Sequence, residues 1–267
     1  MNTHARPTIG ALIRDWRQMR HLSQLDLALE AEISQKHLSF VESGRSQPSR
    51  DMVLRLAEHL AVPLRERNVL LLAAGFAPFY GETSLDAPAL AAAREAVGTI
   101  LTGHEPYPAL AVNRHWQMLA ANRAVGPLLG NVSETALLEP PVNVLRLSLH
   151  PGGLASSIDN LAEWRDHLLA RLRHQARACA DPILAALLAE LSAYPAPQAS
   201  SPQGSDAREP AIVVPLRLRT DLGLLSLIST TTVFGTPLDI TLQELALETF
   251  FPADAQTADR LRRIASA

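Results

Sequence analysis

Four side chains that can read DNA bases lie close together near the amino end of the sequence. They are Gln35, Lys36, Ser39 and Phe40, which a helix would turn to one surface if its apolar positions faced a core. In the major groove, glutamine can pair with adenine, lysine can reach guanine acceptors or a phosphate, and phenylalanine can contact a thymine methyl group. The spacing predicts a helix that reads base edges, although the same polar side chains could simply solvate a helix face.

The surrounding sequence predicts a bundle of five helices that would hold these side chains. Apolar residues recur at helical spacing, and Ser, Asp or Pro stands where helices commonly start. Two short helices separated by a tight break would form a helix-turn-helix, in which the second helix enters the major groove. The five predicted helices begin at Ile9, Ser23, Ser34, Ser49 and Pro63.

The distribution of charge agrees with a nucleic-acid partner at the amino end. Residues 1–75 contain ten Lys and Arg against eight Asp and Glu, a net charge of +2, and the remaining fourteen against nineteen give −5. Local positive charge is what phosphate neutralisation requires.

No stretch approaches the roughly 20 apolar residues of a membrane span, so we expect a cytoplasmic protein. The single cysteine, Cys179, excludes an internal disulfide and is expected in the core.

Beyond the bundle the sequence predicts a second domain of mixed type. We expect the first domain over residues 1–80, a connecting helix over 81–104 and an α+β domain over 105–267. The absence of regular βαβ alternation favours an antiparallel sheet. A loop rich in Pro, Ser and Gly, residues 194–210, is expected to be mobile. Predicted strands cover 108–112, 117–121, 211–219, 222–234 and 240–251, the last of which could equally be helical, and predicted helices cover 122–129, 160–178, 182–193 and 257–264.

Residues 8–75 resemble the phage-repressor, or XRE, family of helix-turn-helix regulators. The resemblance lies in Leu22-Ser23-Gln24, Ile33-Ser34-Gln35, Val41-Glu42-Ser43-Gly44-Arg45 and Pro48-Ser49. It implies a five-helix, lambda-repressor-like domain that binds operator DNA. By position, it also implies an ion pair between Arg17 and Glu42, and DNA contacts from Gln24, Ser34, Gln35, Arg45 and Arg50.

One residue departs from that family's pattern. The family usually has glycine in the turn between the two helices, where this chain has Glu32. Glycine adopts a positive φ at little cost, whereas glutamate there would cost about 1 kcal/mol. We therefore expect the geometry of the turn to differ slightly.

Residues 105–262 resemble the ligand-binding domain of MmyB-like regulators. The resemblance lies in the order of the segments 107–116, 121–124, 143–153, 233–240 and 250–254. It implies a PAS-like fold, in which an antiparallel sheet carries helices over one face and a mostly apolar cavity lies between them. It also implies a fatty-acid-like or other small apolar ligand.

Several residues of this domain are candidates for ligand binding. Arg146 could bind a ligand carboxylate through two parallel donors, or it could pair with a structural acid such as Asp239. His150, followed by Pro-Gly-Gly, could form an anion-binding turn or a plain turn. The aromatic candidates for the cavity wall, each of which could also be ordinary core, are Trp116, Trp164, Phe234 and Phe250.

The sequence offers little support for catalysis, a metal or a cofactor. It lacks the GxSxG, P-loop, HExxH and paired-cysteine motifs. His167 and His174 would share a helix face with Arg171 between them, which is typical of a solvated basic surface. We therefore expect a dimeric transcriptional repressor that binds operator DNA and a small apolar ligand. The alternative is a regulator whose second domain docks a protein partner or dimerises without a ligand.

Overall fold

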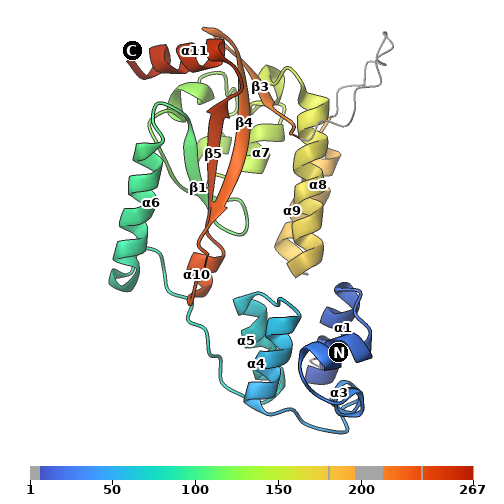
Figure 1. Ribbon diagram of the computed structural model, residues 1–267. Coiled ribbons are helices and arrows are strands. Elements are labelled where there is room, and N and C mark those ends of the chain that lie inside the picture. Colours follow the sequence, from blue (N-terminus) through green and yellow to red (C-terminus); the bar gives the residue numbers. More distant parts are fainter. Residues whose placement is uncertain (1–6, 180, 196–212, 236, 267) are drawn as a thin grey trace. The chain divides into compact units, whose positions relative to one another are not determined.

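The structure is a computed structural model that describes residues 7–179, 181–195, 213–235 and 237–266. These residues form two compact units (Figure 1). The first unit lies within 1–83 and 236–243, and the second within 84–235 and 244–267. Most of the loop predicted over 194–210, and the start of the strand predicted over 211–219, fall outside the described residues.

The first unit contains the five predicted helices, which confirms the all-α prediction. They pack around a core that includes Ile13, Leu38 and Leu56, none of which is accessible to solvent. Side chains of Thr8, Ser23, Ser34 and Ser49 cap the first four helices by accepting backbone N–H bonds. The helices are α1 (Ile9–Met19), α2 (Gln24–Glu30), α3 (Gln35–Glu42), α4 (Arg50–His59) and α5 (Leu64–Ala73).

A segment from the far end of the sequence completes this unit. The short helix α10 (Ile240–Gln243) lies against α5, and the Gln243 side chain accepts a hydrogen bond of 2.7 Å from the backbone N–H of Leu64. This contact caps α5, whose own N-cap residue, Pro63, offers no side-chain bond. Asp239 accepts a bond of 3.1 Å from the backbone of Thr83. Residues 240–251, predicted as strand or helix, therefore form a helix and then a strand.

The second unit is built on a five-stranded antiparallel sheet, as predicted. The strand order is β2-β1-β5-β4-β3, so the last strand of the sequence lies at the centre. Ala109 of β1 pairs with Thr249 of β5, and Thr230 of β4 pairs with Thr249 from the other side. The strands are β1 (Ala109–Val112), β2 (Met118–Ala121), β3 (Leu216–Thr220), β4 (Gly223–Val233) and β5 (Ala246–Pro252).

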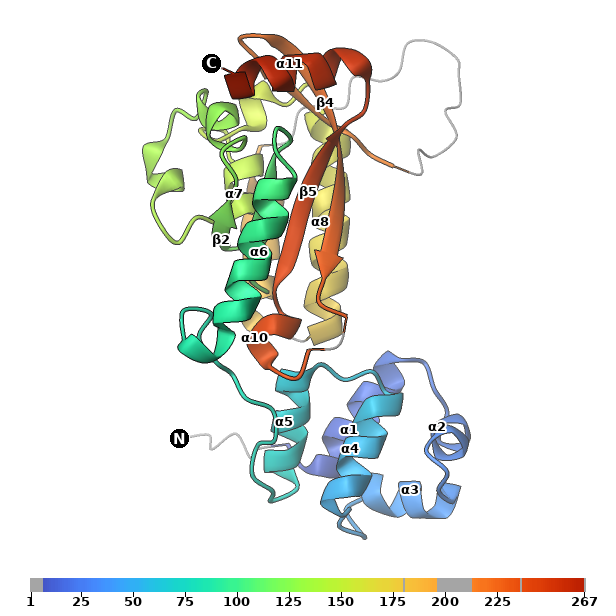
Figure 2. The ribbon, with the colours of Figure 1, turned by 60° about the vertical axis from the view of Figure 1, so that its left-hand side comes forward.

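Helices cover both faces of this sheet, and not one face as the resemblance implied. Helices α8 (Leu161–Cys179) and α9 (Pro182–Ala193) lie on one side, and α6 (Ala91–Gly103) lies along the other (Figures 1 and 2). Val97 and Leu101 of α6 are buried against alanines of β1. The segment predicted as a connecting helix therefore packs against the sheet of its own unit. It covers the face of the sheet opposite α8 and α9.

Smaller elements complete the second unit. Residues 122–129, predicted as helical, contain only a 3-10 turn at Gly126–Leu129, because Pro127 cannot continue a helical hydrogen-bond ladder. Cys179 is half-buried and not a core residue. The remaining elements are the helices α7 (Val144–Leu149) and α11 (Ala255–Ser266), and 3-10 turns at Pro88–Leu90, Thr135–Leu138 and Ala155–Ser157.

The turn between α2 and α3 keeps a left-handed residue although that residue is not glycine. Glu32 has a φ of 53°, in the region that favours glycine. Glutamate in place of the family's glycine thus has an energetic cost, but the turn keeps its left-handed residue. The backbone N–H of Ile33 bonds to the carbonyl of Ala28 and closes the turn.

The strain at Glu32 gives a stability prediction. Because glycine removes the Cβ clash of the left-handed conformation, Glu32→Gly should raise the free energy of unfolding by about 0.5–1 kcal/mol. Chemical denaturation of the full chain measures the change. Glu30→Gly is the matched control, since this exposed glutamate lies within α2 and the same substitution there should lower stability. Equal effects of the two substitutions would contradict the prediction.

Candidate DNA-reading helix and ligand cavity

A buried ion pair fixes α3 against α1. Arg17 donates two hydrogen bonds to the Glu42 carboxylate, from Nε at 2.6 Å and from Nη2 at 3.0 Å. Gln24, the first residue of α2, donates to the same carboxylate at 2.7 Å. The Glu42 side chain has no solvent exposure. One carboxylate therefore joins three helices and holds the exposed side of α3 in a fixed position.

The protonation of Glu42 follows from these contacts. Burial raises the pKa of Glu42, but the hydrogen bonds from Arg17 and Gln24 and the charges of Arg17 and Arg14 lower it more. The net pKa lies below the usual value for glutamate. Glu42 is therefore charged at neutral pH and keeps its ion pair.

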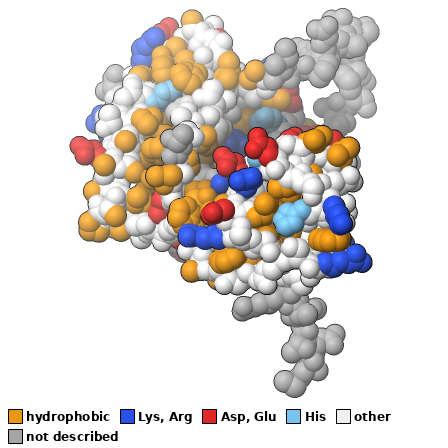
Figure 3. Space-filling view, turned by 60° about the horizontal axis from the view of Figure 1, so that its bottom comes forward, with side chains coloured by type: hydrophobic (Ala, Val, Ile, Leu, Met, Phe, Trp, Pro, Cys, Tyr) orange, Lys and Arg blue, Asp and Glu red, His pale blue; other side chains and the backbone are white. Residues whose placement is uncertain are grey.

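The outward face of α3 carries the side chains that the sequence predicts for base reading. Leu38 and Val41 are fully buried, whereas Gln35 and Lys36 are exposed. Phe40 is half-buried, and its ring lies 5.6 Å from the Lys36 ammonium group and 5.8 Å from the Arg45 guanidinium group. Figure 3 shows a face on which basic, acidic and apolar side chains are mixed.

The remaining candidates for DNA contact lie on α3 or close to its ends. Ser34 accepts a bond of 3.1 Å from His37 and so caps α3. Ser39 lies half-buried on the same helix. Arg45 and Arg50 are exposed, and the Arg50 guanidinium group lies 4.8 Å from the ring of Phe79. The first unit thus gathers all these residues on α3, the loop after it and the start of α4.

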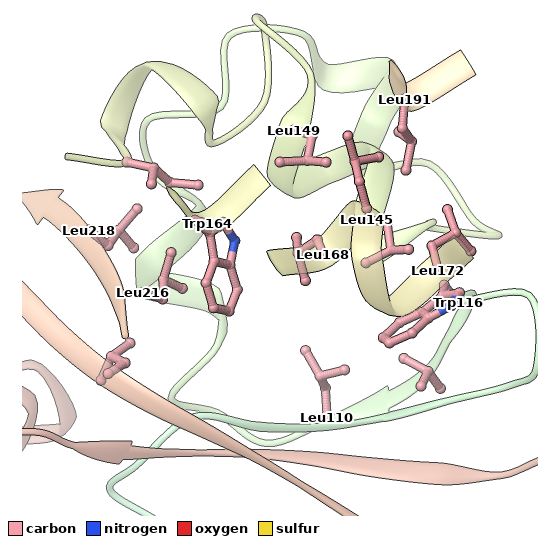
Figure 4. Packing of buried hydrophobic residues seen from close by; sticks show 14 of the residues in the cluster. Leu110, Trp116, Leu145, Leu149, Trp164, Leu168, Leu172, Leu191, Leu216 and Leu218 are labelled. Atoms are coloured by element: carbon pink, nitrogen blue, oxygen red, sulfur yellow. The ribbon is translucent and has the colours of Figure 1, made fainter. Parts of the chain in front are cut away.

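The second unit contains a partly open apolar cavity of about 110 Å³ between the sheet and α7 and α8. Leu110, Trp164 and Leu168 point toward this interior from a strand and a helix (Figure 4). Trp116, Trp164 and Phe250 line it, as the sequence suggests. Among the described lining residues, two carry a charge, Arg171 and Glu248.

Arg171 and Glu248 form a second ion pair, at the wall of the cavity. Arg171 donates from Nη2 to Glu248 Oε1 at 2.6 Å and from Nη1 to Oε2 at 3.2 Å. The guanidinium group also lies 4.5 Å from the Trp116 ring. Arg171 is therefore part of the cavity wall, but its side chain is also 31% exposed, so it belongs only in part to the solvated basic face that the sequence predicts. Its spacing of three and seven residues from Leu168 and Trp164, on one helix face, is the signal in the sequence that indicates this position.

The backbone of Trp116 is unusual for a bulky residue. Its φ is 63°, in the left-handed region, and its indole N–H donates a bond of 2.8 Å to Gln175 of α8. Strained conformations persist only where the surroundings impose them, and they cluster at functional sites. The bond to Gln175 and the Arg171 contact hold the indole against the cavity.

Three of the predicted ligand contacts do not reach this cavity. Arg146 donates two bonds to Glu190 of α9, at 2.6 and 2.7 Å, and pairs with neither a cavity group nor Asp239. Phe234 packs with α6 on the opposite face of the sheet. His150 does not line the cavity; its Nδ1 accepts a bond of 3.0 Å from Gly152, which gives a plain turn.

The two histidines of α8 do not make a metal site. His167 stacks on Trp164 with ring centroids 5.6 Å apart, and its pKa is lowered by burial and then by the charge of Arg171. The described residues hold no group of three or more His, Cys, Asp or Glu side chains that could bind a metal ion. The described helices also include none with the length and apolar character that a membrane crossing requires.

Comparison with known families identifies both units. A family model described as the MmyB-like transcription regulator ligand binding domain matches residues 93–264, well over half of the chain. The chain belongs to the MmyB-like transcription regulator family. A second model, of a helix-turn-helix, matches residues 13–67 of this MmyB-like regulator and confirms the XRE-type resemblance. The chain thus combines a helix-turn-helix unit with an MmyB-like ligand-binding domain.

Two individual proteins are similar to parts of this MmyB-like regulator. The ImmF control region 10 kDa protein of Bacillus phage phi105 is 41% identical over 49 residues, which are 18% of this chain and 54% of that protein. The chain thus spans about half the length of that relative. The crystal structure of the clp gene regulator ClgR from Corynebacterium glutamicum matches 38% of this chain and 99% of that one, at 24% identity and a TM-score of 0.23.

The Arg17–Glu42 pair gives a pH-dependent prediction for this MmyB-like regulator. Arg17→Met leaves a buried carboxylate without its partner and should lower the free energy of unfolding by about 3 kcal/mol at pH 7. Because the pKa of Glu42 is depressed in the folded wild type, the pair stabilises above about pH 4.3, the ordinary glutamate pKa, and less as the pH falls through the folded value.

Urea denaturation of the wild type and Arg17→Met at pH 7 and at acidic pH measures this dependence. The difference between them should shrink as the pH falls below 4, because a protonated Glu42 no longer needs a cation. Arg14→Met is the matched control, since the Arg14 side chain is 45% exposed and lies 3.5 Å from Glu42. A pH-independent loss in Arg17→Met would show that packing alone causes it.

Proposed function

We propose that this protein is a one-component bacterial repressor that acts in the cytoplasm, binds operator DNA as a homodimer, and changes its DNA affinity when a small apolar molecule binds. The observation that carries the proposal is that one chain holds both an exposed polar face on α3, supported by a buried ion pair, and an apolar cavity. The first can distinguish base pairs and the second can distinguish small molecules.

For the DNA contacts we assign different roles to different residues. Gln35, Lys36, Ser39 and Phe40 contact base edges, because they lie on the outward face of α3. Gln24, Ser34, Arg45 and Arg50 contact the backbone from the surrounding segments. Since one recognition helix covers only a few base pairs, a symmetric dimer that reads two half-sites about one helical turn apart provides enough specificity.

A double substitution tests the assignment to bases. Gln35→Ala with Lys36→Ala should abolish the preference for the operator while leaving most of the salt-dependent affinity for unrelated DNA. The operator is first recovered by selection from a random DNA library, and binding to it and to scrambled DNA is then measured by fluorescence anisotropy over a range of salt concentrations.

The control pair is Gln18→Ala with Arg173→Ala, which removes the same residue type and one positive charge at exposed positions of α1 and α8. This control should retain the operator preference. An equal loss of affinity for operator and scrambled DNA in the Gln35/Lys36 variant would show that both residues contact only the backbone.

For the second unit we propose ligand binding in the cavity, with regulation through two conformations. A ligand can shift DNA affinity only if the two conformations of the protein bind it differently. The cavity of about 110 Å³ is smaller than an engineered cavity of about 150 Å³ that admits benzene, so a ligand of fatty-acid length requires the cavity to widen.

The small volume also favours a second candidate function. In that alternative, the side chains of the unit fill its own interior, and the unit docks a partner protein or dimerises. Native mass spectrometry of the full chain purified from its own cells separates the two. A retained small apolar compound supports ligand binding, and an empty domain with a co-purified protein supports docking.

A cavity-filling variant tests whether the retained compound binds in the cavity. Leu168→Phe adds volume at the cavity wall and should reduce the retained compound at least tenfold relative to the wild type. Ile183→Phe is the control, because Ile183 is exposed on α9 and outside the cavity. Equal retention by both variants would show that the compound binds elsewhere.

A further inference from the structure

We propose that the cavity takes an uncharged amphiphile, an apolar molecule with one neutral hydrogen-bonding group such as a hydroxyl or a carbonyl, placed beside Arg171 and Glu248. This inference rests on the proposed ligand-binding function and names the chemical class of the ligand. It differs from a fatty acid in one property, the charge of the polar end.

The charges at the cavity wall already balance each other. Arg171 and Glu248 make a two-point ion pair, and Thr231 lies between them: its hydroxyl donates to Glu248 at 3.0 Å and accepts from Arg171 at 2.7 Å. The Glu248 residue is 5% exposed, so solvent does little to stabilise its charge. The guanidinium group, packed near the Trp116 ring, provides the compensation that the carboxylate requires.

A ligand carboxylate would disturb this balance. It would share with Glu248 one guanidinium group, on a side chain that is 31% exposed, and two carboxylates would then face one cation beside a largely apolar wall. The excess negative charge would be removed from water without a partner, which is strongly unfavourable. The backbone position of Glu248 is fixed by the central strand β5, in which its neighbours Leu247 and Thr249 are buried.

A neutral polar group fits the same wall without this cost. The contacts of Glu248 occupy three of the roughly four lone-pair sites of a carboxylate, so a ligand hydroxyl can donate to it. The hydroxyl groups of Ser148 and Ser229 also line the cavity, and Ser148 accepts a bond of 3.0 Å from Trp164. The remaining wall is almost entirely aliphatic or aromatic, and it matches an apolar body.

Chain-matched probes test the charge preference. Hexan-1-ol, hexanoate and hexylammonium are titrated into the full chain at pH 7, and decan-1-ol and decanoate are added so that chain length is separated from charge. Trp116 and Trp164 line the cavity and report binding by fluorescence, above the constant signal of Trp16 in the first unit. We expect each alcohol to bind at least tenfold more tightly than the acid of the same length.

Charge-removing variants should reverse this preference. Glu248→Gln leaves the guanidinium group unneutralised and should shift the preference at least tenfold toward hexanoate, whereas Arg171→Gln leaves the carboxylate and should favour hexylammonium. Arg146→Gln breaks an ion pair of similar geometry outside the cavity and should leave the preference unchanged.

The outcomes separate this inference from the proposed function. Tighter binding of either acid than of its alcohol by the wild type would overturn the inference and leave ligand binding in place, whether or not the variants fold. Binding of none of the probes to the wild type would overturn both. An unchanged preference in a folded Glu248→Gln variant would show that the ion pair does not set the selectivity.

Discussion

A charge removed from water needs a partner, and the two units of this protein each depend on one buried carboxylate that meets this constraint. In the first unit Glu42 accepts bonds from Arg17 and Gln24, which lie on two other helices. In the second unit Glu248, on the central strand, accepts bonds from Arg171 of α8. Each carboxylate stabilises only when its partner is in place, so each pair holds separate elements in one arrangement.

The two ion pairs lie in different places in their units. The Arg17–Glu42 pair lies behind α3, so it stabilises the helix while leaving Gln35 and Lys36 exposed to a partner. The Arg171–Glu248 pair lies at the wall of an interior cavity, where it can be contacted by a molecule that enters. A similar interaction is therefore structural in one unit and a candidate for recognition in the other.

The chain itself connects the cavity with the DNA-binding unit. Gln243 caps α5 in the first unit, and the sequence continues within a few residues into β5, which carries Glu248. The central strand of the second unit is thus tied by a short covalent connection to a helix that completes the first unit.

Short-range patterns in the sequence determined most of the first unit. Helix caps such as Ser23 and Ser34 act over three residues, and the periodicity of Leu38 and Val41 decides which face of α3 is buried, so both are readable locally. The strands of the second unit were also indicated by local composition. The contacts that the sequence did not indicate join residues that lie far apart in it. Arg146 and Arg171 look alike locally, but Arg146 meets Glu190, 44 residues on, and Arg171 meets Glu248, 77 residues on. Only tertiary packing brings such groups together, and it decided which arginine lines the cavity, which face of the sheet receives Phe234, and that α10 completes the first unit.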